Sequence, residues 1–321
     1  MVGCGKGHGL CKALLSSLED KNQDKNIIFY IQFYFLGVIF MAYFHITSDS
    51  TCDLSEELIK ANNIAIIPIG IMLDGEMYHD DVDINAKKVL EYVDKTGKLP
   101  KTSATATQEY VDFFTQMTAD GTPVLHISLS SGASSCNEHA KMAAEEFDNV
   151  YVVDSHQLSS GQGLLVMKAV DFRAQGMDVK ECFEKVSALT DKARTSFVLD
   201  RLDFLHKGGR CSLAKLIGAK ILKIHPHISM REGTLKFKKS YQGNLLRGVG
   251  QYVNDLAAEF TDYDKTRVFV THCEADEVIV ETVKNKVKEL FDFDQIIETR
   301  AGTTITSHCG RNCIGVLFIA E

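Results

Sequence analysis

The chain has 321 residues, of which 45% are hydrophobic and 24% are charged, and its net charge at pH 7 is −8. This composition is ordinary for a globular protein large enough for two domains, and four prolines leave little room for long disordered linkers. The acidic balance excludes a nucleic-acid binder, because phosphate neutralisation needs a clustered basic face and the lysines and arginines here are scattered. Nine cysteines without a regular framework predict reduced thiols and a cytoplasmic protein.

The first forty residues differ from the rest of the chain. Residues 27–44 form an apolar and aromatic run behind a segment rich in Gly, Lys, Ser and Cys. Such a run has the length of a borderline membrane span, and behind basic residues it also resembles a signal anchor. A third interpretation is that Met41 is the true start, since the chain then opens directly into a strand. We favour this one, treat residues 1–40 as a leader of doubtful nativeness and expect no stable membrane insertion.

Residues 41–175 predict a parallel, doubly wound α/β domain, because short apolar runs alternate with helical patterns. The predicted strands span 44–47, 64–71, 123–127 and 150–153. The predicted helices span 56–62, 86–96, 108–117 and 137–147, with another beginning near 160. Two hydroxyl-rich connectors, 101–107 and 128–135, precede helices, and the acidic run 78–83 predicts a solvated loop.

Residues 176–321 predict a smaller mixed-sheet α/β domain. The predicted strands span 195–199, 266–271, 296–299 and 314–320, and 221–230 with 234–241 form a hairpin. The predicted helices span 179–193, 245–260 and 276–290. Gly208 and Gly209 indicate a helix C-cap with Arg210 just beyond it, and 302–308 predicts a loop that carries His308.

Several catalytic and metal motifs are missing from the sequence. Neither the nucleophile elbow GxSxG nor the phosphate loop GxxxxGK[ST] occurs. Two groups of possible metal ligands lack the paired CxxC spacing of a structural zinc site: His272-Cys273, and His308-Cys309 with Cys313. We therefore predict no metal and no cofactor.

Two interpretations of the hydroxyl-rich loops stay open at this point. Ser134 and His308 could form a Ser–His pair in space, since such pairs are recognised by geometry and not by sequence order. Neutral hydroxyls with one imidazole also suit hydrogen bonding to a carboxylate on a long apolar body. For any single loop taken alone, a capped turn or an ordinary loop histidine is the better explanation of the residues.

Short motifs along residues 41–321 together resemble the DegV family. They are ITSDS at 46–50, KTS at 101–103, the serine-rich run 127–134, VDS at 153–155, FLHKGGR at 204–210 and SHCG at 307–310. The resemblance implies a DegV-like two-domain fold, with a parallel α/β domain and a smaller mixed α/β domain that close on one long-chain fatty acid such as palmitate. It further implies a carrier without catalytic residues. Members of the FakB type present the fatty acid to a separate ATP-binding kinase subunit, which makes an acyl phosphate.

By the same resemblance, Thr102, Ser103, Ser134 and His308 would surround the carboxylate, and Arg210 would face the kinase. The sequence departs from the family pattern at Ser135-Cys136, Thr105, Gln242 and Arg311. These changes leave the carboxylate hydroxyls in place and put docking of the kinase in doubt. We also expect Arg311, near His308, to add a charge at the head-group site. The alternative is an acyl hydrolase or transferase that uses Ser134 and His308.

Overall fold

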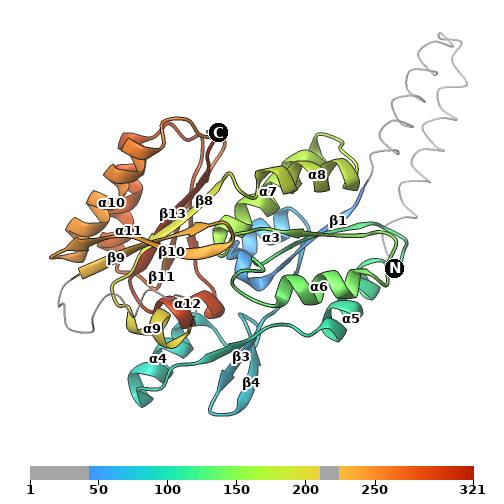
Figure 1. Cartoon of the computed structure of the whole chain (residues 1–321), viewed down its shortest axis with the longest axis horizontal. Coiled ribbons are helices and arrows are strands. Elements are labelled where there is room, and N and C mark those ends of the chain that lie inside the picture. Colours follow the sequence, from blue (N-terminus) through green and yellow to red (C-terminus); the bar gives the residue numbers. More distant parts are fainter. Residues whose placement is uncertain (1–42, 210–223) are drawn as a thin grey trace, which may run out of the picture. The chain divides into compact units, whose positions relative to one another are not determined.

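The computed structural model describes residues 43–209 and 224–321, and residues 44–321 form one compact unit (Figure 1). The predicted leader, residues 1–40, lies outside the described residues, as does Arg210. The described part of the unit is built on three β-sheets of four, six and three strands. Among the described helices, none combines the length and the apolar character needed to cross a membrane.

The four-stranded sheet is parallel throughout and has the order β2-β1-β6-β7. Its strands are β1 (His45–Asp49), β2 (Ile64–Ile67), β6 (Val124–Ser128) and β7 (Val150–Asp154). Every residue of β6 is buried, as expected for a strand with helices on both faces. This sheet confirms the predicted parallel α/β arrangement.

Helices alternate with the strands through this half of the chain. They are α3 (Glu56–Ala61), α4 (Ala86–Thr96), α5 (Thr107–Met117), α6 (Cys136–Ala144), α7 (Ser160–Ala174) and α8 (Val179–Leu189), with a short 3-10 turn η1 (Ser50–Cys52). Local signals set their starts: the side chains of Ser55, Asn85 and Asp178 each accept a backbone N–H at a helix N-terminus.

The predicted strand 64–71 is wrong as a single element. The chain leaves the parallel sheet at Ile67 and enters a separate antiparallel sheet, order β4-β3-β5, formed by β3 (Gly70–Leu73), β4 (Glu76–His79) and β5 (Lys101–Ser103). Pro68 stands at the break, and a proline cannot donate a ladder hydrogen bond. The connector 101–107 therefore begins as a strand.

The six-stranded sheet follows in sequence, with the order β10-β9-β8-β13-β11-β12. Its strands are β8 (Ala193–Val198), β9 (Ile224–Arg231), β10 (Thr234–Gln242), β11 (Val268–Cys273), β12 (Ile296–Arg300) and β13 (Cys313–Ile319). Only β11 and β12 pair in parallel, so the sheet is mixed as predicted. Helices α10 (Leu245–Glu259) and α11 (Glu277–Leu290) pack together and bury Val253 and Val283 in a core with strands β11 and β13.

Helix α7 lies between the parallel sheet and the six-stranded sheet. Its first eight residues are all buried, and Leu164 and Leu165 share one hydrophobic cluster with Ile127 of the first sheet and Leu317 of the second. A helix covered on all sides needs no polar stripe, and the buried first half of α7 has none. The strands of the parallel sheet all precede residue 175 and those of the six-stranded sheet all follow it. The domain boundary at 175–176 itself stays a prediction.

Two short helices complete the fold, α9 (Asp203–Lys207) and α12 (Thr303–Cys309). Gly208 is the C-cap of α9, in agreement with the glycine signal. The predicted loop 302–308 is wrong, because residues 303–309 are helical. Helix α12 contacts α4, α9, β3, β5 and β11, so it stands where the three-stranded sheet meets the six-stranded one (Figure 1).

Candidate functional site

A cavity with about 610 Å³ of space outside protein atoms, part of it open to solvent, lies beside α12. Its wall is mostly apolar and includes Leu129, Phe197 and Ile305. The polar residues on the wall are Thr102, Ser134, Thr304 and His308. The cavity therefore combines an apolar lining with hydroxyls and one imidazole, which is the usual composition of a small-molecule site.

Thr102 and His308 meet although they are far apart in sequence. Thr102 lies on β5, His308 lies in the last turn of α12, and the Thr102 Oγ1 atom is 2.9 Å from His308 Nε2. Both side chains are half-buried. Ser103 is the next residue of the strand and does not line the cavity, because neighbouring side chains of a strand point to opposite faces.

Ser134 reaches the cavity from the loop before α6. Its Oγ donates to the sulfur of Cys136 at 3.2 Å and accepts the Cys136 N–H at 3.3 Å, which fixes the hydroxyl at the helix start. Other serines of the loop have structural partners: Ser128 donates to Asp49 at 3.0 Å, and Ser130 donates to the carbonyl of Gly233 at 2.7 Å. Of these three serines, Ser134 lines the first cavity, and its contact with a carboxylate stays a prediction.

Asp49 holds the start of this loop from inside the parallel sheet. Its fully buried carboxylate accepts the Leu129 N–H at 2.6 Å and the hydroxyl of Tyr110, and His126 Nε2 lies 3.5 Å away. Burial alone would raise the pKa of Asp49, but the hydrogen bonds and charge of these partners, His126 first, lower it. A buried carboxylate with several donors fixes the loop in one position.

Three carboxylates from the first half of the chain anchor the start of α12. Asp53 accepts the Gly302 N–H at 2.9 Å, Asp80 accepts the Thr304 N–H at 3.2 Å and Asp81 accepts the Thr303 hydroxyl at 3.0 Å. The acidic run 78–83 is therefore more than the solvated loop that we predicted, since Asp80 is only 2% exposed.

The surroundings of Asp53 destabilise the charged form of its carboxyl group. Burial raises the pKa of Asp53 well above its ordinary value, and the neighbouring charges of Asp80 and Asp81 raise it further, although hydrogen bonds from Ser159 and Gly302 act in the opposite direction. These surroundings therefore favour the protonated form of Asp53 more than they would for an ordinary aspartate.

Thr304 is a site residue that the sequence argument missed. It lines the cavity and is 5% exposed, and its Oγ1 has no hydrogen-bond partner among the described residues. An unpaired buried hydroxyl is costly, so such an atom beside a cavity indicates a group that binds there. The threonine-rich run 303–306 just before His308 is a signal for this part of the site, but nothing in the run separates Thr304 from its neighbours.

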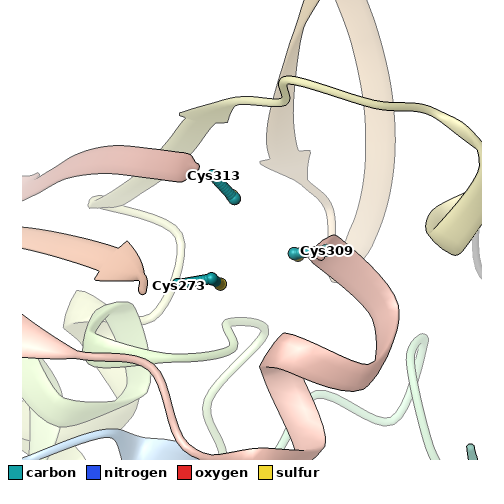
Figure 2. A group of neighbouring side chains, drawn as sticks. All are labelled: Cys273, Cys309 and Cys313. Atoms are coloured by element: carbon teal, nitrogen blue, oxygen red, sulfur yellow. The ribbon is translucent and has the colours of Figure 1, made fainter. Parts of the chain in front are cut away.

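A second cavity, with about 310 Å³ of space, continues inward from the first and shares Leu158, Phe197, Ile305 and Cys309 with it. Three buried cysteines lie on its wall, Cys273, Cys309 and Cys313 (Figure 2). Hydrogen bonds with the thiols of Cys273 and Cys313 lower the pKa of Cys309 below its ordinary value. The two cavities together extend the apolar space away from His308.

Two of the sequence departures, Gln242 and Arg311, lie at the surface. Arg311 pairs with Asp94 of α4 at 2.8 Å, and both side chains are largely exposed. Gln242 is the exposed last residue of β10. Arg311 is not among the described residues that line the first cavity, so its charge is used at the surface.

Comparison with known proteins identifies the fold. A family model described as "Uncharacterised protein, DegV family" matches residues 43–321. A DegV domain-containing protein of Staphylococcus aureus strain MRSA252 is 30% identical over 278 residues, which cover 86% of this chain and 98% of that protein.

Solved structures agree with this assignment. A DegV family protein from Thermus thermophilus, described by its fatty-acid binding, has a TM-score of 0.80 at 22% identity, and the match covers 87% of this chain and 99% of that one. A stearic acid-binding protein from Eubacterium ventriosum has a TM-score of 0.73 at 26% identity, with 87% and 98% covered. The order of the motifs, the three sheets and the family match lead to one conclusion: the chain belongs to the DegV family.

Proposed function

We propose that this protein is a carrier that binds one long-chain fatty acid, with the carboxylate at Thr102, Ser134 and His308 and the acyl chain in the two apolar cavities. The observation that supports it is the meeting of hydroxyls and an imidazole from β5, the loop before α6 and α12 at one apolar cavity. A carboxylate that accepts hydrogen bonds from such donors needs no full counter-charge. The relatives that bind fatty acids support the same ligand class.

The alternative of an acyl hydrolase is less well supported by the geometry. His308 Nε2 is hydrogen bonded to Thr102, and the hydroxyl of Ser134 donates to Cys136. A nucleophilic serine would need its hydrogen bond to a base. We therefore assign no catalytic residue and no cofactor, and we expect the protein to work in the cytoplasm with its thiols reduced.

The test is a titration of the purified chain with palmitate or oleate by calorimetry. Ser134→Ala should weaken binding by about 5–150-fold, which corresponds to the loss of a hydrogen bond worth about 1–3 kcal/mol. Ser131→Ala is the matched control, because Ser131 belongs to the same loop and is exposed. A chain that takes up neither fatty acid, or a Ser131 variant that loses as much affinity as the Ser134 variant, would contradict the proposal.

We further propose that the bound carboxylate is presented to a separate ATP-binding kinase subunit. Thr102, Ser134 and His308 on the cavity wall are half-buried and not fully enclosed, which supports access by a partner. Hydroxylamine trapping of acyl phosphate, in a mixture of this chain, ATP, oleate and a fatty acid kinase subunit, tests it. ATP-dependent hydroxamate is expected, and its absence with lipid still bound would reject presentation while leaving the carrier role intact.

A further inference from the structure

Three cysteines from three different elements converge beside the second cavity. Cys273 is the last residue of β11, Cys313 is the first residue of β13, and the two lie directly opposite each other in the antiparallel pair. Cys309 is the last residue of α12. The three Sγ atoms all lie within 4.8 Å of one another (Figure 2).

The turn between α12 and β13 makes this convergence possible. Gly310 follows Cys309 with φ +71° and ψ −175°, a conformation that is essentially restricted to glycine. The Asn312 N–H then donates to the carbonyl of Cys273 at 3.0 Å, which ties the turn to β11. The spacing Cys309-x3-Cys313 does not match a paired CxxC motif, so no sequence pattern predicts a third thiol beside these two.

We propose that Cys273, Cys309 and Cys313 form a binding site for one soft, thiophilic metal ion. Thiolate sulfur is the ligand type that selects zinc and monovalent copper over the harder ions. With a metal–sulfur distance of about 2.3 Å, three sulfurs around one ion lie about 4 Å apart, so small side-chain rotations close the observed triangle. The group of potential ligand atoms found here consists of sulfur alone.

The burial of the three cysteines and their position beside the cavities are consistent with a binding site for an ion. The cysteines are between 1% and 5% exposed, so the site is shielded from water. Cys309 lines both cavities, and the cavities give an ion a route to the cluster from the surface. The other described cysteines, Cys52, Cys136 and Cys182, are buried as well but do not belong to the group.

The test uses the full chain, reduced and free of lipid, under anaerobic conditions. Zn²⁺ and Cu⁺ are titrated separately against a chromophoric competing chelator. One ion per chain should bind, and Cys273→Ser, Cys309→Ser and Cys313→Ser should each weaken binding at least tenfold. Cys182→Ser is the matched control for a buried thiol. A combined C4S/C11S/C211S variant removes the thiols outside the described residues and should bind the ion as the unaltered chain does.

A second measurement guards against variants that fail to fold. Co²⁺ added to the unaltered chain should give the thiolate-to-cobalt charge-transfer absorption of metal–sulfur bonds, and added Zn²⁺ should displace it. Binding of either Zn²⁺ or Cu⁺ with these properties supports the site, and the tighter of the two identifies the preferred ion. Absence of binding by both ions, or binding that disappears only in the C4S/C11S/C211S variant, would overturn the proposal.

Discussion

Replacing Thr304 by valine should change the stability of the empty protein and the affinity for a fatty acid in opposite directions. Thr304 lines the first cavity, is 5% exposed, and its hydroxyl has no partner within the described part of the chain. Valine keeps the branched shape and removes the hydroxyl. Because an unpaired buried hydroxyl costs about 1–3 kcal/mol, the free energy of unfolding of the lipid-free variant should rise by about 1 kcal/mol.

The same substitution should weaken binding of the carboxylate. A hydrogen bond to a charged group is worth about 1.5–3 kcal/mol, which corresponds to a dissociation constant about 10–150-fold higher. The assays are urea denaturation of lipid-free protein and calorimetric titration with oleate. The free energy of unfolding and the dissociation constant for oleate are measured on the same preparation. A general folding defect would lower the stability as well as the affinity, and so differs from the expected result.

Thr303→Val is the contrasting variant for stability. The hydroxyl of Thr303 donates to Asp81 at 3.0 Å and to the carbonyl of Ile84 at 3.2 Å, so its removal should destabilise the protein by about 1 kcal/mol. If Thr304→Val destabilises the empty protein as Thr303→Val does and leaves the affinity for oleate unchanged, the hydroxyl of Thr304 does not serve the head group.

Three further substitutions test how the site is held. Asp49→Ala leaves buried donors without their acceptor, so urea denaturation should show a loss of about 3–5 kcal/mol, and a loss below about 1 kcal/mol would contradict this role. The raised pKa of Asp53 means that the folded state binds this proton more tightly than the unfolded state, so the contribution of Asp53 to stability grows as the pH falls toward the ordinary pKa of an aspartate. Asparagine tolerates the φ of +49° at position 53, so Asp53→Asn should remove the pH-dependent part of the stability that comes from Asp53. An unchanged pH dependence of the melting temperature in this variant would contradict the role of Asp53. Gly310→Ala would place a Cβ 2.8 Å from the ring of Phe204 at φ +71°, so calorimetry should show destabilisation of at least about 1–3 kcal/mol.

The regular elements were predictable because their signals are local. The capping side chains of Ser55 and Asn85 mark helix starts, and the alternation of apolar runs with helical patterns indicated the parallel sheet. The break in 64–71 was missed although Pro68 marks it, because the residues on both sides are equally apolar. Strand Lys101–Ser103 is too short and polar to show a period of its own.

The site was only partly predictable, for a different reason. Helix α12 begins with a threonine-rich run of low helix propensity, and its N-terminus is held by the carboxylates of Asp53, Asp80 and Asp81 from the other end of the chain. Such long-range contacts leave no local pattern. The family motifs pointed to Thr102, Ser134 and His308, which the structure brings to one cavity, but only the folded arrangement sets Ser103 apart and adds Thr304.

The central claim, that this chain carries a fatty acid, is tested most directly by native mass spectrometry of the intact purified protein. We predict a species heavier than the bare chain by the mass of one long-chain fatty acid, which is lost on denaturation and restored by incubation with palmitate or oleate. A chain that shows its bare mass before and after that incubation would contradict the account.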